Sequence, residues 1–257
     1  MKFKLEDLRT TRQSLISGDI TLEDIHEKIE ERRIERVINV SKKLPNLAAE
    51  FPEVKKLIIL IDIVGFSKAS TREQVNNIYL FQRYLVGNIL NNHLGFKGKI
   101  HISRFIPTGD GCYIVADECE PETALDFLTT LIGGFNQLKD EEDKALSIRA
   151  SALIGSCVPF MDIAKHINYI GEGMNEAARI LSGGQSSLEK KFAKENPEAS
   201  VLDAKMYSRN SLYLGDSLTK PIKEYKDICN SVVRFLDVPD KHGMKRNITI
   251  LQGIKFE

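Results

Sequence analysis

Hydrophobic residues follow two distinct patterns along the chain. The run LIILIDI, residues 57–63, is almost continuously apolar, which is typical of a strand buried on both faces of a sheet. Apolar residues then recur at helical spacing up to about residue 92, and Ser70 with Glu73 forms a helix-start signature. This stretch therefore predicts a strand followed by a helix.

The same patterns predict the central region. HISRF (101–105) and CYIVA (112–116) resemble strands, and IPTGDG between them has the residues of a hairpin turn. Pro121 begins a second predicted helix, and SIRASALIGSCV (147–158) alternates like a strand.

Towards the C-terminus, residues 172–181 predict a third helix, which we expect to end before Gly183-Gly184. Two further strands are expected at residues 232–238 and 248–253. The order β-α-β-β-α-β, followed by a helix and more strands, predicts an α+β fold with a ferredoxin-like core.

The first 50 residues differ from the rest. Leu22, Ile25 and Ile29 lie at helical spacing in a highly charged stretch. We expect residues 1–50 to form a helical extension that docks on the domain or pairs with another chain, or a solvated surface helix. Residues 51–257 are expected to form the main domain.

The composition of the chain mainly excludes classes of protein. The 36 Lys+Arg residues balance the 36 Asp+Glu residues, which argues against a nucleic-acid coat or a polybasic membrane surface. The four cysteines form no CxxC pair, so we expect free or buried thiols rather than a zinc site. The sequence contains no apolar signal segment or membrane-spanning run, which favours a cytoplasmic protein.

Two carboxylates stand out against this background. Asp62 lies in the apolar run LIILIDIVGF, where a carboxylate needs a metal ion or a basic side chain as a partner. Asp110 lies in the hairpin turn TGDG. The first strand and the hairpin are neighbours in a ferredoxin-like unit, so the two carboxylates can converge on Mg²⁺ or Mn²⁺ with phosphate oxygens. Taken singly, each is also explained as a strand-end or turn residue.

Two further segments fit a phosphate ligand. Gly65, Phe66 and Ser67 form a loop between a strand and a helix, where backbone N–H groups can cradle phosphates. Asn175 and Arg179 are four residues apart on one helical face. Arg179 is flanked by small apolar residues, and an Arg in that setting often binds an acidic partner or a phosphate. An ordinary surface Arg gives the same local pattern.

Taken in order, these segments resemble the catalytic domain of class III nucleotidyl cyclases. IDIVGFS and TGDGCYIV are similar to its two metal motifs, SIRASALIGSCV to its central strand, and NYIGEGMNEAARIL to its G-x-x-x-N-x-x-x-R helix. The resemblance covers roughly residues 55–255.

The resemblance implies a role for each matched residue. Asp62, Asp110 and the Ile63 carbonyl would bind two divalent ions, Mn²⁺ or Mg²⁺. Asn175 would orient the ribose, and Arg179 would stabilise charge on the α-phosphate. In this family the metal ligands and the Asn/Arg pair come from opposite subunits, which implies a head-to-tail homodimer with two sites at its interface.

The family also places a Lys against the triphosphate, on a loop between late strands. VPDKHGMKRN (238–247) occupies that place, with Lys241 as the preferred candidate and Lys245 and Arg246 as rivals. A hairpin with solvated charges is the alternative.

The base-reading positions depart from the family pattern. Ile106 and Asn168 stand where members that use purines carry Lys and Asp, or Glu and Cys. Ile106 cannot hydrogen-bond a base, whereas Asn168 offers a donor and an acceptor. The chain is therefore a pyrimidine cyclase, similar to those of bacterial antiphage signalling, or a cyclase of ATP or GTP with another readout, or an inactive nucleotide-binding regulatory module. We favour a cyclase of UTP or CTP that produces a second messenger.

Overall fold

The computed structural model contains two compact units. One comprises residues 53–159 and 167–257, and the other comprises residues 1–52 and 160–166. The predicted extension, residues 1–50, lies outside the described residues. The structure describes residues 52–95, 100–137, 146–162, 166–200, 203, 210–220, 222–225, 227–239 and 243–254.

The described elements follow the predicted order, with two short strands added. They are β1 (Val54–Ile63), η1 (Phe66–Lys68), α3 (Thr71–Gly95), β2 (Ile102–Pro107), β3 (Gly111–Asp117), α4 (Pro121–Gln137), β4 (Ile148–Met161), β5 (Ile167–Ile170), α5 (Glu172–Glu195), β6 (Ser211–Leu214), η2 (Asp216–Leu218), η3 (Ile222–Tyr225), β7 (Cys229–Pro239) and β8 (Lys245–Ile254).

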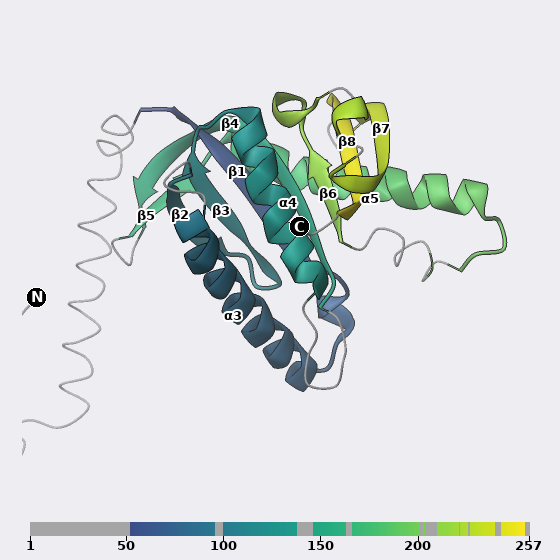
Figure 1. Ribbon diagram of the computed structural model, residues 1–257, viewed down its shortest axis with the longest axis horizontal. Coiled ribbons are helices and arrows are strands. Elements are labelled where there is room, and N and C mark those ends of the chain that lie inside the picture. The colour runs from purple at the N-terminus through teal and green to yellow at the C-terminus, as the bar shows by residue number, and fades with distance from the viewer. Residues whose placement is uncertain are drawn as a thin grey trace, which may run out of the picture. The chain divides into compact units, whose positions relative to one another are not determined.

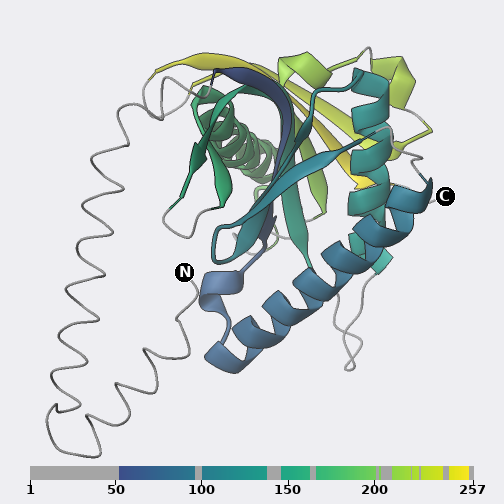
Figure 2. The same cartoon turned by 90° about the vertical axis from the view of Figure 1, so that its left-hand side faces the viewer.

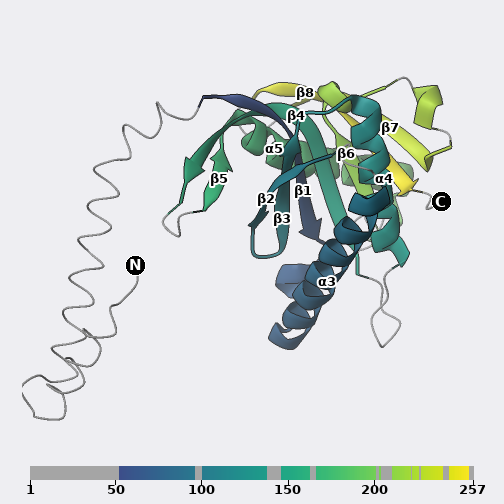
Figure 3. The ribbon, with the colours of Figure 1, turned by 60° about the vertical axis from the view of Figure 1, so that its left-hand side comes forward.

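One mixed sheet has the strand order β2-β3-β1-β4-β6-β8-β7, and β5 pairs with β4. The first four strands have the order of a ferredoxin-like unit, with β1 antiparallel to both β3 and β4. The predicted fold class is confirmed. Helices α3 and α4 cover one face of the sheet and α5 covers the other (Figure 1). In the view turned by 90°, α3 runs along the face of the sheet that it covers (Figure 2). The view turned by 60° shows β2, β3 and β1 side by side (Figure 3).

Strand β1 explains why the sheet has two separate cores. Leu57, Ile59 and Ile61 pack on the side of α3 and α4, which we call the α3/α4 face. Ile58 and Leu60 pack on the opposite side with α5, which we call the α5 face. All five side chains are buried, as the continuous apolar run predicts, because alternate residues of a strand point to opposite faces.

The predicted start of α3 is confirmed in detail. The hydroxyl of Ser70 donates to Glu73 Oε2 at 2.7 Å, and the Ser70 N–H donates to the same oxygen at 2.8 Å. The Glu73 N–H donates back to Ser70 Oγ at 3.4 Å. This reciprocal arrangement satisfies N–H groups that the first turn of a helix leaves without partners.

The predicted end of the third helix is wrong. Helix α5 continues through Gly183 and Gly184 to Glu195. A Cβ at Gly184 would lie 2.5 Å from Cδ1 of the buried Tyr213 on β6. Gly184 is therefore required by close packing of the helix on the sheet, and this use of glycine has the same sequence signature as a helix end.

Candidate active site

Asp62 lies near the end of β1 and has a basic partner. It pairs across the sheet with Arg149 of β4, and the Arg149 guanidinium donates from Nη2 to Asp62 Oδ2. Both side chains are 16 % exposed. Strand alternation places Asp62 on the α5 face, because Ile58 and Leu60 lie there. The cationic partner that a carboxylate in an apolar strand requires is therefore present within the chain.

Asp110 lies in the turn before β3 and is brought next to Asp62. Its carbonyl oxygen accepts a hydrogen bond of 2.8 Å from the N–H of Ile63. The N–H and C=O of one strand residue point to the same side, so the Ile63 carbonyl faces the turn that carries Asp110. Gly111 pairs with Asp62, and a side chain at Gly111 would overlap the backbone of β1. The sequence places glycine here because the two strands approach closely.

Burial and two charged neighbours, Arg149 and Asp110, shift the pKa of Asp62. Burial raises the pKa of Asp62, the hydrogen bond and charge of Arg149 lower it, and the negative charge of Asp110 raises it again. The net direction is upward. A divalent cation between these carboxylates would relieve their repulsion and compensate the burial.

The donor set fits a magnesium-type site. Two carboxylates and one carbonyl leave positions for water and phosphate oxygens, which is how Mg²⁺ is usually held beside a triphosphate. Within the residues that the structure describes, no cluster of three or more His, Cys, Asp or Glu side chains could hold a metal by itself. The site suits a metal that arrives with its phosphate ligand rather than an all-protein cage.

The loop after β1 forms a tight turn. Gly65 adopts a φ of 79°, which favours glycine, and precedes the short helix η1. Phe66 packs partly against the core of the α3/α4 face. The N–H groups of Lys68 and Ala69 bond within the turn at 3.0 and 3.1 Å. The predicted phosphate loop of residues 65–67 thus lies directly after the strand that ends with Asp62 and Ile63.

Asn175 and Arg179 lie in the first turns of α5, as predicted. Asn175 is exposed, whereas the Arg179 side chain is 24 % exposed. Arg179 Nη1 donates to Glu172 Oε1 and lies 3.7 Å from Glu176 Oε2. These carboxylates are seven and three residues before Arg179, so they share its side of the helix.

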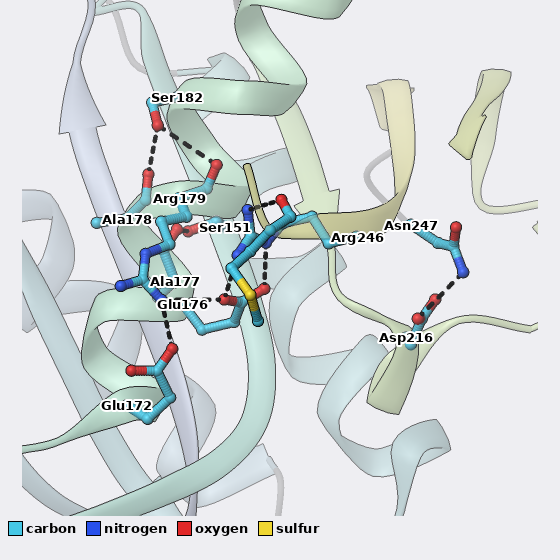
Figure 4. A network of polar contacts seen from close by, with 11 residues as sticks. Ser151, Glu172, Glu176, Ala177, Ala178, Arg179, Ser182, Asp216, Arg246 and Asn247 are labelled. Carbon is cyan, nitrogen blue, oxygen red and sulfur yellow. Dashed lines mark hydrogen bonds and ion pairs between the residues drawn. The ribbon is translucent and has the colours of Figure 1, made fainter. Parts of the chain in front are cut away.

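Arg246, a rival candidate for the triphosphate, belongs to the same network. Its Nε and Nη2 donate to the two carboxylate oxygens of Glu176 at 2.6 and 3.0 Å (Figure 4). Only 9 % of its side chain is exposed, whereas its rival Lys245 is exposed. The preferred Lys241 lies outside the described residues.

The two base-reading candidates have different surroundings. Ile106 on β2 is half-buried and packs against the core of the α5 face. Asn168 on β5 is half-buried, and its Oδ1 accepts a hydrogen bond of 2.9 Å from the Tyr169 N–H. A base near these two positions would meet the apolar side chain of Ile106 and the side-chain amide of Asn168.

Sequence reasoning did not name Arg149 or Glu176. A signal for Arg149 was available, because it is the one charged residue in the alternating run SIRASALIGSCV. Strand alternation alone does not identify its partner, since Asp62 lies 87 residues away. Glu176 had no such signal, because a Glu on a helix is ordinary.

The fold is that of nucleotidyl cyclase catalytic domains. The catalytic core of a rhodopsin-guanylyl cyclase with converted specificity, in complex with ATPαS, has a TM-score of 0.54 and 15% identity over 79% of this chain and 98% of that chain. The guanylate cyclase domain of RhGC from Catenaria anguillulae, in complex with GTP, has a TM-score of 0.51 and 16% identity, over 79% of this chain and 100% of that one.

A third structure is a double mutant of the guanylyl cyclase domain of a fusion protein from Blastocladiella emersonii, crystallised as a monomer. It has a TM-score of 0.52 and 16% identity over 80% of this chain and 99% of that chain. No family model matches the sequence, and no curated protein matches it. At these identities the likeness shows the common fold.

The remaining structural expectations concern cysteines and membranes. All four cysteines are free thiols, and Cys112, Cys157 and Cys229 are buried. Burial raises the pKa of the Cys112 thiol to about 12. Among the helices in the described part of the chain, none is long and apolar enough to cross a membrane.

Proposed function

We propose that the chain is a metal-dependent nucleotidyl cyclase, which converts a nucleoside triphosphate into the 3′,5′-cyclic monophosphate and pyrophosphate. The observation that carries the proposal is the convergence of Asp62 and Asp110 at the paired ends of β1 and β3. Arg149 compensates one negative charge, so a second carboxylate in this half-buried site favours a further cation as its partner.

Asp62, Asp110 and the Ile63 carbonyl would hold two divalent ions, Mn²⁺ or Mg²⁺. Such ions lower the pKa of a ribose hydroxyl and neutralise charge on a triphosphate. Gly65, Phe66 and Ser67 would line the phosphate path beside them. Catalysis then depends on how well the chain positions the substrate and on preorganised charge.

Asn175 would orient the ribose, and Arg179 would stabilise charge that develops on the α-phosphate. Lys241 would bind the triphosphate. Arg149 adds a guanidinium beside the metal ligands, and its buried Nε has no hydrogen-bond partner among the described residues. Its hydrogen-bonding capacity is therefore not exhausted by Asp62.

Two copies would form a head-to-tail homodimer in which each site takes its metal ligands from one subunit and its Asn/Arg pair from the other. Several large apolar side chains on or beside the strands are exposed in the single chain, and a partner subunit would cover them. They are Ile167 and Ile170 on β5, Leu236 on β7 and Met244 before β8.

UTP or CTP is the preferred substrate. Ile106 supplies an apolar wall instead of a purine-reading polar group, and Asn168 can offer a donor and an acceptor to a pyrimidine edge. The cyclic product would act as a second messenger. We further propose a role in antiphage signalling, for which the support is the resemblance of the sequence to pyrimidine cyclases.

Incubation with ATP, GTP, CTP and UTP separately in Mn²⁺, with products identified by mass, tests the proposal. We expect a cyclic pyrimidine monophosphate and pyrophosphate from the wild type and none from Asp110→Asn. Cyclic AMP or cyclic GMP as the main product would contradict the pyrimidine preference alone. No cyclic product from any of the four would contradict the cyclase itself.

A further inference from the structure

Arg179 belongs to a network of four charged side chains. Glu172, Glu176 and Arg179 lie on α5, and Arg246 reaches them from β8, 70 positions further along the chain than Glu176 (Figure 4). The two arginines and two glutamates balance in charge. The two glutamates differ in exposure to solvent, and this difference indicates which ion pair water or a phosphate can replace.

The Glu176–Arg246 pair is the fixed part. Arg246 binds both oxygens of Glu176 in a fork, and its Nη1 also donates to the Met244 carbonyl at 3.3 Å. Exposed fractions of 9 % for Arg246 and 23 % for Glu176 show that the pair is largely removed from water. Bidentate guanidinium–carboxylate pairs combine strength with a defined geometry.

The Arg179–Glu172 contact is the exchangeable part. Glu172 is 67 % exposed, so water can replace it when Arg179 moves to a phosphate. Glu176 cannot leave in this way, because Arg246 holds both of its oxygens. Its Oε2 therefore stays 3.7 Å from Arg179 Nη1 as a fixed negative charge.

We propose that Glu176, held by Arg246, is a positioning residue that fixes the Arg179 guanidinium where it meets the α-phosphate. The inference rests on the proposed cyclase function. Without Glu176, the guanidinium would keep only the exposed Glu172 among the two carboxylates of this network. The pair also joins β8 to α5, the helix that carries Asn175 and Arg179.

A double-mutant cycle on the full chain tests the proposal. Glu176→Gln keeps the size of the side chain and removes its charge. We expect kcat with the nucleotide that the wild type cyclises to fall about 10- to 100-fold, with KM changed little, because small misplacement of a catalytic group costs this much. In an Arg179→Ala background the same substitution should have no further effect on kcat.

Glu189→Gln is the matched control. Glu189 lies on the same helix and accepts a hydrogen bond of 2.7 Å from Gln185, outside the network. We expect wild-type kcat for this variant. If Glu176→Gln does not fold, Arg246→Lys replaces it in the double-mutant cycle, because lysine keeps the positive charge but cannot bind both oxygens of Glu176 in the same geometry.

The outcomes separate the two proposals. Equal loss of kcat from Glu176→Gln with and without Arg179 would show a merely structural role and overturn the positioning of Arg179. Wild-type kcat in Glu176→Gln would overturn it as well, while leaving the cyclase intact. If the wild type cyclises no nucleotide, the function fails, and the cycle is measured as affinity for UTP by calorimetry. Additive losses of UTP affinity in the two variants, or no binding of UTP by the wild type, would also overturn the proposal that Glu176 positions Arg179.

Discussion

The two faces of the sheet use the same strands for different purposes. On the α3/α4 face, a continuous apolar core packs against two helices, with Phe81, Tyr84 and Phe135 in contact. On the α5 face, the apolar core is interrupted by charged pairs, among them Asp62–Arg149 and Glu176–Arg246. The first face stabilises the fold, and the second carries the charged groups to which the proposed function assigns a phosphate and its metal ions.

This division follows from strand alternation. Ile61 and Asp62 are adjacent on β1 and point to opposite faces, so one strand supplies both a core residue and a half-buried carboxylate. Substitutions on the two faces should therefore separate stability from activity. Substitutions on one face that changed stability and turnover together would contradict this division between the faces.

The largest expected effect is on turnover, from Asp110→Asn. We expect a loss of at least about 1000-fold, which corresponds to roughly 4 kcal/mol in the barrier, because a metal ligand is removed. Stability without metal should stay equal or rise, since the charge of Asp110 opposes ionisation of Asp62. Thermal melting with and without Mn²⁺ checks both parts: Mn²⁺ should stabilise only the wild type. Retained turnover would remove Asp110 from the site.

Phe135→Ala on the α3/α4 face should do the reverse. Phe135 is fully buried, with its ring 4.3 Å from that of Tyr84 and 5.4 Å from that of Phe81. We expect a loss of about 3–5 kcal/mol in the free energy of unfolding, measured by urea denaturation, with kcat per folded molecule unchanged. Tyr79→Ala is the control, because Tyr79 is 64% exposed and should cost less than about 0.5 kcal/mol. A large loss of kcat in folded Phe135→Ala would contradict the division.

A smaller effect is expected from Gly184→Ala on the α5 face. The new Cβ would overlap Tyr213, at a cost of about 1–3 kcal/mol, and the gain in helix propensity of about 1 kcal/mol offsets part of it. We expect a net destabilisation of up to about 2 kcal/mol in urea denaturation.

Gly183→Ala is the matched control for this position. Its Cβ would lie 3.3 Å from Val238 Cγ1, a tight contact that a shift of the Val238 side chain relieves. Helix propensity should offset much of this cost, so Gly183→Ala should destabilise less than Gly184→Ala. Equal effects at both glycines would mean that helix propensity, rather than contact with β6, decides.

The sequence could predict those parts of the fold that depend on local pattern. The strand around LIILIDI, the cap at Ser70 and the order of the first six elements follow from apolar runs and start signals. Asp62 and Asp110 could be paired because ferredoxin-like topology makes their strands neighbours. Their resemblance to cyclase motifs agrees with the fold that the structure shows.

The rest depends on contacts between distant residues. Strand β6 has four buried residues, too few for a periodic pattern, and its place is set by pairing with β4 and β8. The extension of α5 through Gly184 depends on Tyr213. The pairing of Glu176 with Arg246 likewise requires the tertiary structure, because neither residue is unusual in its own segment.

The most direct measurement mixes two variants with strongly reduced turnover, Asp62→Ala and Arg179→Ala. If each site takes its metal ligands from one chain and Arg179 from the other, a heterodimer contains one complete site. Random exchange of equal amounts should restore about a quarter of wild-type turnover, because half of the dimers are mixed and each has one of two sites. A mixture that stays inactive while native mass spectrometry shows heterodimers would contradict the shared site.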